Sequence, residues 1–455
     1  MTHRRASGLA SFLAIWFGQT FSLLGSALTS FALGIWVYQE SGSVTRFTTT
    51  ALCAVIPPLL LSPFAGSIVD RWDRRRAMIL GDAGAGLGTL ALAWLFWAGR
   101  VEFWHICALL ALNAAFSSLQ FPAFSASITL LVPKRHFGRA NGLVQFGHSI
   151  ATLVAPLASG FLLDSLQIKG IVAIDFLTCL VAIGTLLAVR IPRVAASEAG
   201  AAPRKPSAFA DAALGWRYIR TRPGLTTLLL LFLGVNFVTT CVESLITPLV
   251  LSFASATVLG IVVSGAGIGM VLGGMLMTAW GGPRRRMPAV LGFLALQGTM
   301  LLVGGLRPSA VLISAAAFVY LFCTPIINGS AQVIWQSKIP PGLQGRVFAI
   351  RQMVAMSALP IAYLVVGPLS DYVFEPALAP GGPLAASFGP VLGTGPGRGL
   401  GLFLLVLGVL VLAAAAAARR SASLRDLEDR LPDEVPEDLE TIRELPNSSL
   451  LEGNP

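Results

Sequence analysis

The chain has 455 residues, of which 55% are hydrophobic and only 12% are charged, and its mean hydropathy is +0.75. A soluble globular protein carries about 25% charged residues, so this composition excludes an ordinary water-facing surface and indicates a chain embedded in lipid. The net charge of +10 does not indicate nucleic-acid binding, because the basic residues stand in short clusters between long apolar runs, as in cytoplasmic membrane loops.

Twelve long apolar runs predict an all-α integral membrane protein, because a bilayer-spanning helix needs about 20 mostly apolar residues. The runs cover residues 9–38, 46–69, 77–98, 103–131, 140–163, 170–190, 224–252, 256–280, 287–306, 308–331, 346–373 and 398–418. The first run is far longer than the apolar region of a signal peptide, so we expect it to be an uncleaved first span.

The distribution of basic residues predicts the orientation in the membrane. With the N-terminus inside, 22 of the 27 Lys and Arg residues before Ala418 fall on the cytoplasmic side, and the inverted orientation would reverse that ratio. We therefore expect both termini in the cytoplasm. The abundance of Gly and Ala and the excess of Arg over Lys indicate a bacterial source, so the expected location is the inner membrane.

The sequence repeats itself at an offset of 207 residues, with ten identities between residues 133–164 and residues 340–371. The matched positions include Pro133 and Pro340, Gly138 and Gly345, Arg139 and Arg346, Gln145 and Gln352, Gly160 and Gly367, and Asp164 and Asp371. The repeat predicts two six-helix halves with a substrate site near the midplane between them. The expected parts are residues 1–190, a cytoplasmic linker at 191–223, residues 224–418 and an acidic tail at 419–455.

The loop after the second run holds Gly66, Asp70, Arg71, Arg74 and Arg75. This spacing resembles the signature of the major facilitator superfamily, and together with the span count and the repeat the resemblance covers essentially the whole chain. It implies the major facilitator fold and a cytoplasmic latch that holds the outward-facing state. A basic loop that only sets topology is the alternative, but it would not require Gly66 or Asp70.

Further charged residues near the cytoplasmic mouth are expected to belong to this gate. Asp82 lies early in the third run and is expected to extend the Asp70 network. Arg139 and Arg346 begin the fifth and eleventh runs. Asp73 departs from the small residue that the family usually has at its position.

The fifth run contains Ala155, Pro156, Ser159 and Gly160, which resemble a weakened form of the packing motif found in exporters of the superfamily. Small residues and a proline allow close packing and a bend between the halves. Ordinary helix packing is the alternative explanation. The stretch from Pro133 to Gln145 further resembles the branch that includes macrolide efflux proteins and the enterobactin exporter.

Acidic residues inside the membrane are candidates for proton coupling. Glu243 lies in the seventh run and is our first choice, with a neutral structural glutamate as the alternative. Asp175 is a further candidate, but we favour its interpretation as a solvated residue near the outer surface. The first run has no acid before Glu40, so proton coupling is expected from the resemblance and not from these residues alone.

Polar residues within the apolar runs are candidates for lining the central cavity. They are Asn113, Gln145, Asn236, Asn328, Arg351 and Gln352. Asn236 and Glu243 are seven residues apart and are expected on one helix face. Arg351 can attract anionic substrates or extend its side chain toward the interface.

These features predict a secondary transporter that exports small amphipathic molecules, whether drugs, macrolide-like or siderophore-like compounds, by proton antiport. Uptake of a metabolite is the alternative within transport, and a non-transporting sensor or scaffold is the alternative outside it. No enzyme signature, metal-ligand cluster or cofactor motif is present in the sequence. We expect a monomer whose partners are its substrate, protons and the lipid bilayer, with no nucleic acid.

Overall fold

The computed structural model describes residues 2–71, 73–133, 137–189, 208–425 and 427–430; some side chains within these ranges, including those of residues 62–71, are not described. Every element in this part of the chain is helical. The first group of helices is α1 (Thr2–Ser41), α2 (Val44–Arg71), α3 (Arg74–Ala98), α4 (Phe103–Leu131) and α5 (Phe137–Ala188). After α6 (Ala208–Arg220) come α7 (Pro223–Leu251), α8 (Ala256–Trp280), α9 (Arg286–Leu306), α10 (Ala310–Ser337), α11 (Pro341–Leu369), α12 (Glu375–Leu378), α13 (Ala385–Leu392), α14 (Arg398–Arg420), α15 (Ala422–Arg425) and α16 (Leu427–Arg430).

Ten helices of the described chain are long and apolar enough to cross a membrane. One of them, α5, has 52 residues, which is about 78 Å of helix against a hydrocarbon core of about 30 Å. Its backbone breaks at Gln167, where φ is 54° and ψ is −178°, so α5 holds two of the predicted spans. With α4 included, and with the π-helical turn Ser370–Phe374 that continues α11, all twelve predicted runs lie within helices to within two residues.

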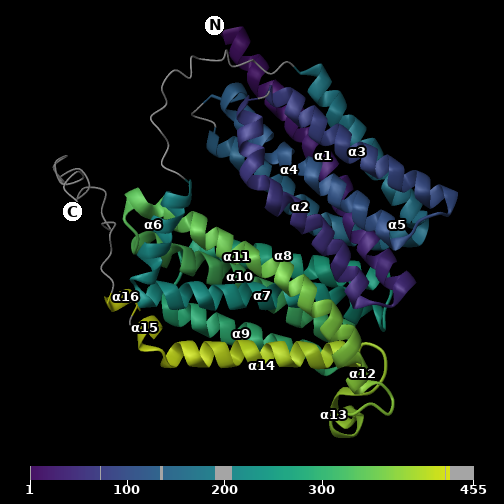
Figure 1. Cartoon of the computed structure of the whole chain (residues 1–455), viewed down its shortest axis with the longest axis vertical. Coiled ribbons are helices and arrows are strands. Elements are labelled where there is room, and N and C mark those ends of the chain that lie inside the picture. The colour runs from purple at the N-terminus through teal and green to yellow at the C-terminus, as the bar shows by residue number, and fades with distance from the viewer. Residues whose placement is uncertain (1, 72, 134–136, 190–207, 426, 431–455) are drawn as a thin grey trace.

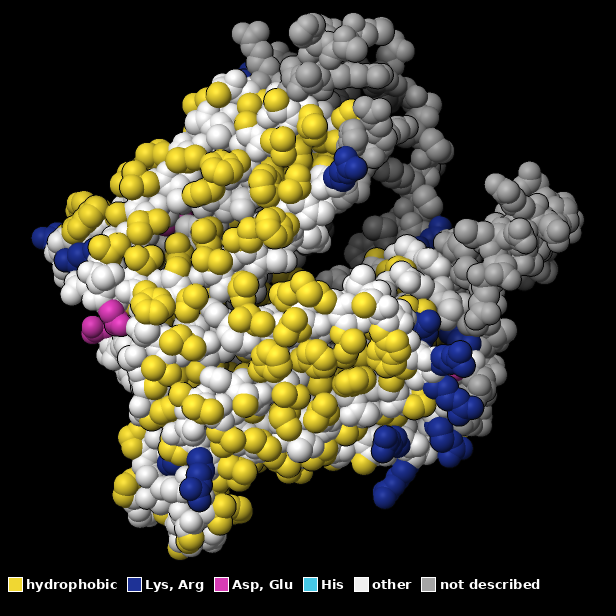
Figure 2. All heavy atoms as spheres, turned by 180° about the vertical axis from the view of Figure 1, so that it is seen from behind, with side chains coloured by type: hydrophobic (Ala, Val, Ile, Leu, Met, Phe, Trp, Pro, Cys, Tyr) yellow, Lys and Arg dark blue, Asp and Glu magenta, His cyan; other side chains and the backbone are white. Residues whose placement is uncertain are grey.

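The helices form two bundles, which Figure 1 shows one above the other. We call α1–α5 the N-terminal bundle and α7–α14 the C-terminal bundle. Large apolar side chains cover the surface of both, while Lys and Arg gather at one end of the C-terminal bundle, as Figure 2 shows. This pattern is that of a lipid-facing belt with a basic cytoplasmic end.

The two bundles share a hydrophobic core at their outer ends and have separate cores at their cytoplasmic ends. The shared core joins Ile35 and Val44 of the N-terminal bundle to buried side chains of α7, α8 and α11. The cytoplasmic cores are built around Phe12 and Met78 in one bundle and around Trp335 in the other. Figure 2 shows the molecule hollowed between the bundles. The structure is therefore closed on the outer side and open toward the cytoplasm.

Glycines allow the bundles to approach closely at two outer contacts. A Cβ atom on Gly160 of α5 would lie 2.7 Å from the carbonyl oxygen of Ala256, and one on Gly260 of α8 would lie 2.7 Å from that of Pro156. At the second contact, a Cβ on Gly367 of α11 would lie 2.6 Å from the Cα of Thr45 in α2. Any larger residue at these positions would force the helices apart.

The remaining residues of the fifth-run motif pack within the N-terminal bundle. Ala155 is buried, and the hydroxyl of Ser159 donates to the carbonyl of Leu28 in α1 over 3.0 Å. The four residues thus lie on a stretch of α5 that contacts α1 on one side and α8 on the other. Their geometry is that of a packing motif.

Two aspartates that the sequence repeat pairs also bridge the bundles. Asp371 accepts hydrogen bonds from the backbone amides of Val44 and Thr45, both over 2.9 Å, and from the Ser43 hydroxyl over 2.6 Å. Its carboxylate therefore satisfies the open amides at the start of α2 and opposes the positive end of that helix dipole. Asp164 accepts a hydrogen bond from the Thr257 hydroxyl at the start of α8.

The cytoplasmic end of the C-terminal bundle is covered by α6 and by the start of the tail. The last part of the expected linker region forms α6, whose Tyr218 hydroxyl donates to the carbonyl of Lys338 over 3.0 Å. The first residues of the tail form α15 and α16, and Leu424 and Leu427 are buried. The carboxylate of Glu428 accepts from the amides of Arg286 and Met287 at the start of α9.

Most of the predicted linker and tail lies outside the described residues, so the domain bounds at 190, 223 and 418 stay predictions.

We expect replacement of Asp371 by Ala to open the outer side, because it removes the acceptor for three hydrogen bonds at the start of α2. Hydrogen bonds to a charged group contribute about 1.5–3 kcal/mol, so the ratio of closed to open molecules should fall by roughly tenfold or more. Spin labels at the exposed positions Arg46 and Tyr372 would report the distance by pulsed electron resonance. The control is Glu102→Ala, because Glu102 contacts only its own helix α4. An unchanged distance distribution in Asp371→Ala would show that the carboxylate does not hold the closed state.

Candidate functional site

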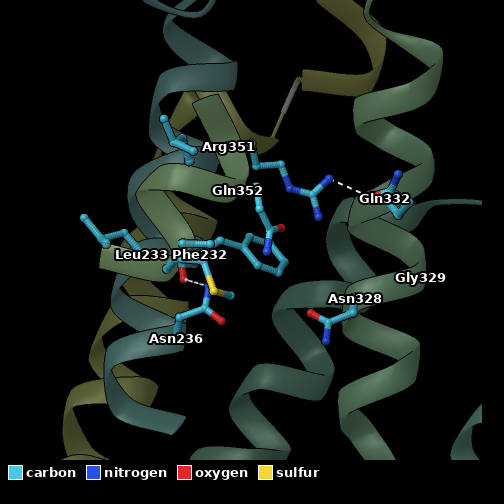
Figure 3. Close-up of a pocket in the computed structure, with 11 residues that line it drawn as sticks. Phe232, Leu233, Asn236, Asn328, Gly329, Gln332, Arg351 and Gln352 are labelled. Carbon is cyan, nitrogen blue, oxygen red and sulfur yellow. Dashed lines mark hydrogen bonds between the residues drawn. The ribbon is translucent and has the colours of Figure 1, made fainter. Parts of the chain in front are cut away.

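The largest of the described cavities lies in the C-terminal bundle, between α7, α10 and α11, and we call it the Arg351 cavity. It has a volume of about 470 Å³. Four of the six residues predicted to line a central cavity meet here: Asn236, Asn328, Arg351 and Gln352. Figure 3 shows Asn236 and Asn328 on opposite sides of the space, with Gln352 above them. The cavity therefore gathers amide groups from helices that are far apart in the sequence.

Arg351 is half-buried and held from two sides. Its Nη1 donates to Oε1 of Gln332 on α10 over 2.6 Å, as Figure 3 shows, and its guanidinium lies 5.6 Å from the centre of the Trp335 ring. These contacts hold the guanidinium at the cavity, contrary to the alternative in which it extends toward the interface. No Asp or Glu is among the described residues that line this cavity. The remaining guanidinium N–H groups can therefore bind an oxygen-rich or anionic group of a ligand.

The amide side chains around Arg351 are only partly used by the protein. Asn236 donates to the carbonyl of Phe232, one turn earlier in α7, over 2.8 Å. Asn328 and Gln352 are exposed to the cavity. Gln332 was not among the residues predicted from the sequence; its signal is an amide inside the long run of α10.

A second cavity, which we call the Glu243 cavity, lies farther along α7 toward the outer side. Its volume is about 290 Å³, and its lining is almost entirely apolar. Phe31 of α1 and Thr152 of α5 also contribute to it, so it reaches the N-terminal bundle. Glu243 is exposed to this space, and it makes no hydrogen bond or ion pair with any residue that the structure describes. A lone carboxyl group in an apolar cavity can bind either a proton or a cation.

A third cavity, the Gln19 cavity, lies in the N-terminal bundle between α1, α4 and α5. It has a volume of about 210 Å³ and is lined by Gln19, Ser26, Gln120 and His148, among others. The sequence analysis missed Gln19 and Gln120, although an amide within an apolar run is the same signal that identified Asn236. Asp82 lies directly behind them and is hydrogen-bonded to both.

Two acidic residues of the N-terminal bundle, Asp82 and Asp175, are held by hydrogen bonds inside it. The carboxylate of Asp82 is hydrogen-bonded to Gln19 and Gln120. Its expected link to Asp70 stays a prediction, because the Asp70 side chain lies outside the described residues. Asp175 is only 3% exposed and accepts from the hydroxyls of Ser26 and Thr89, so its interpretation as a solvated residue is wrong. Close packing of α1 on α5 explains this burial, because a Cβ on Gly25 would lie 3.1 Å from the Cα of Asp175.

Two predicted cavity residues lie away from the three cavities. Asn113 lines a small space of about 30 Å³ inside the N-terminal bundle, next to Asp175. Gln145 is exposed on α5 and is not among the residues that line a described cavity. Both predictions relied on residue type and span position, which do not reveal the direction in which a side chain points.

The structure describes some of the gating candidates and not others. The side chains of Gly66, Asp70 and Arg71 lie outside the described residues, and their latch stays a prediction. Arg75 donates to the carbonyls of Leu186 and Leu187, both over 2.7 Å, and thereby caps the C-terminal end of α5.

The other charged groups of the mouth have structural positions as well. Asp73 caps the start of α3 by accepting from the amides of Arg75 and Arg76, while Arg74 is half-buried in the same turn. Arg139 is exposed near the start of α5. Arg346 lies in the first turns of α11, where a Cβ on Gly215 of α6 would meet its carbonyl oxygen at 2.8 Å.

No group of His, Cys, Asp and Glu side chains in the described part of the chain has the arrangement of a metal site. The five cysteines are free thiols. The chemistry that the three cavities offer is therefore reversible binding through amides, hydroxyls, one guanidinium and one carboxyl group.

Known proteins share both the sequence pattern and the fold. Residues 15–363 match the family model of the Major Facilitator Superfamily. Macrolide efflux protein A of Streptococcus pyogenes is 26% identical over 374 residues, covering 80% of this chain and 90% of that protein. The multidrug efflux pump Tap of Mycolicibacterium fortuitum is 26% identical over 368 residues, covering 76% of this chain and 86% of that protein.

Among solved structures, a bacterial homologue of the human lysosomal transporter Spinster, in an inward-facing conformation, superposes with a TM-score of 0.67. It is 17% identical, and the match covers 91% of this chain and 96% of the other. The nucleoside transporter NupG superposes with a TM-score of 0.64 at 14% identity. The family model spans most of the chain, and the two-bundle fold agrees with it. The chain belongs to the Major Facilitator Superfamily: it is a multi-pass membrane transporter and not an enzyme.

Proposed function

We propose that this transporter exports amphipathic small molecules, macrolide-like or drug-like, by proton antiport with alternating access. The observation that carries the proposal is the pair of cavities along α7, one polar around Arg351 and one apolar around Glu243. A molecule with an oxygen-rich part and an apolar part could occupy both. The names of the macrolide and multidrug efflux relatives support the same class of substrate.

The cavity chemistry favours large, weakly charged substrates over small ionic ones. Among the described residues that line the three cavities, Arg351 is the only Lys or Arg, and His148 of the Gln19 cavity is the only His. A transporter that takes up a small anion would be expected to surround it with several cationic groups. Siderophore-like substrates stay a prediction from the sequence, without support from the relatives named above.

Glu243 is the proposed coupling group of this cycle. Its carboxyl group is exposed to an apolar cavity where no described cation compensates an ionised form. Inside the membrane such a group is stabilised by binding either a proton or a cationic part of the substrate. If the two exclude each other, inward movement of protons drives outward movement of substrate.

The outer contacts supply the second requirement, which is that only one side opens at a time. In the described state, Gly160, Gly260 and Gly367 bring the bundles together on the outer side, while the molecule is hollowed between the bundles toward the cytoplasm. This is the state in which an exporter loads its substrate.

The first test measures accumulation of a macrolide antibiotic and of ethidium in a bacterium that lacks its own major pumps. We expect the intact protein to lower accumulation several-fold, and an uncoupler or Glu243→Gln to abolish the effect, since each removes the proton cycle. Glu40→Gln at the outer end of α1 is the matched control and should behave like the intact protein. If a protein that reaches the membrane instead raises accumulation, uptake becomes the better assignment.

A second test addresses Arg351 as a substrate ligand. We expect Arg351→Met to raise the macrolide concentration for half-maximal transport by roughly tenfold or more, because hydrogen bonds to a charged donor contribute about 1.5–3 kcal/mol. The measurement is concentration-dependent export from loaded cells, with Arg285→Met at the exposed cytoplasmic surface as the control. Equal half-maximal concentrations in both variants would remove Arg351 from the binding site.

A further inference from the structure

Three side chains from three helices close a hydrogen-bonded ring inside the N-terminal bundle. Nε2 of Gln19 on α1 donates to Oδ2 of Asp82 on α3 over 2.8 Å. Nε2 of Gln120 on α4 donates to Oε1 of Gln19 over 2.6 Å and also to Oδ1 of Asp82. Both carboxylate oxygens of Asp82 are thus held by amides.

The ring depends on the close packing of α3 against α4. A Cβ on Gly81, next to Asp82, would lie 3.2 Å from the carbonyl oxygen of Phe116 and 3.5 Å from the Cβ of Gln120. This short separation brings Gln120 to the carboxylate. Asp82 itself is only 2% exposed.

The groups that face Asp82 from every packed element are electrically neutral. Gln19 faces it from α1, Gln120 from α4 and Cys179 from α5, where the thiol donates to the carbonyl of Asp82 over 3.1 Å. Asp175 lies one turn before Cys179 and adds a second acid to this region. No Lys, Arg or His in the described part of the chain pairs with Asp82, so an ionised carboxylate here would be buried without a counter-ion. Such a charge is costly, and binding a proton removes it.

The ring also borders a cavity of the N-terminal bundle. Gln19 and Gln120 line the Gln19 cavity, so their amides separate Asp82 from that cavity. A protonated carboxyl group becomes a hydrogen-bond donor, which requires one glutamine to turn its oxygen toward Asp82. That turn would present a different amide group to a molecule in the cavity.

We propose that the ring of Asp82, Gln19 and Gln120 is a proton-binding site, separate from Glu243, that couples proton occupancy to the polar surface of the Gln19 cavity. The O–H bond forms on Asp82 when the cavity faces outward, and the proton leaves to water when it faces the cytoplasm. The assignment rests on the proposed proton antiport, which it deepens by adding a second proton-binding group in the opposite bundle.

The experiment uses the full chain in proteoliposomes, with Asp82→Asn as the test variant. Transport of a radiolabelled macrolide is measured in two ways, as uphill movement driven by an imposed pH gradient and as exchange without a gradient. We expect Asp82→Asn to lower the rate of uphill movement at least tenfold and to leave the rate of exchange unchanged, because the amide cannot carry a proton. Asp82→Glu should restore part of the uphill movement with a shifted pH profile. Cys179→Ala is the matched control, since it removes the neighbouring contact without changing the ring.

A direct measurement needs no substrate. The infrared carbonyl band of a protonated carboxylic acid should disappear from the intact protein as pH rises, and this titrating component should be missing in Asp82→Asn but present in Cys179→Ala. An identical titrating band in Asp82→Asn and the intact protein would overturn the proposal, and so would gradient-driven transport at the intact rate in that variant. If the band titrates as expected but the intact protein moves no compound against a pH gradient, the proton site stands and the proposed antiport fails.

Discussion

The close approach of the two bundles at their outer ends is the constraint on which the rest of the structure depends. Backbone meets backbone at Gly160 and Gly260 on one side and at Gly367 on the other, and Asp371 caps the first turn of α2 across the interface. Among the described residues, a shared core joins the bundles at this end, while each bundle has a core of its own at the cytoplasmic end. A transporter can use this arrangement because the contacts are confined to one end, so opening the outer side breaks a few hydrogen bonds and separates the small part of the N-terminal bundle that enters the shared core.

The two bundles contribute different chemistry to the space between them. The C-terminal bundle offers a guanidinium with several amides, followed by an apolar cavity with one carboxyl group. The N-terminal bundle offers hydroxyl and amide groups and the imidazole of His148 to its cavity, and keeps the carboxyl groups of Asp82 and Asp175 buried. This division suits a carrier that binds its substrate mainly on one bundle and places proton-binding groups in both.

The cytoplasmic ends of the helices are stabilised by caps that the chain supplies from other elements. Arg75 closes the end of α5, Asp73 the start of α3 and Glu428 the start of α9. Each places a charge where the helix dipole favours it. The basic loop after α2 and the acidic start of the tail thus have packing roles beyond setting topology.

The sequence by itself determined the span positions, the orientation, the two-fold repeat and the family signature, because apolar length, basic loops and identical residues at fixed spacing are properties of the chain alone. It also identified Asn236, Asn328, Arg351 and Gln352 as residues of one cavity. Only the tertiary structure decided which polar side chains meet, since that depends on helix rotation and on the distance between helices. For this reason Asn113 and Gln145 were misplaced, Asp175 proved to be buried, and Gln19 and Gln120 emerged as the partners of Asp82.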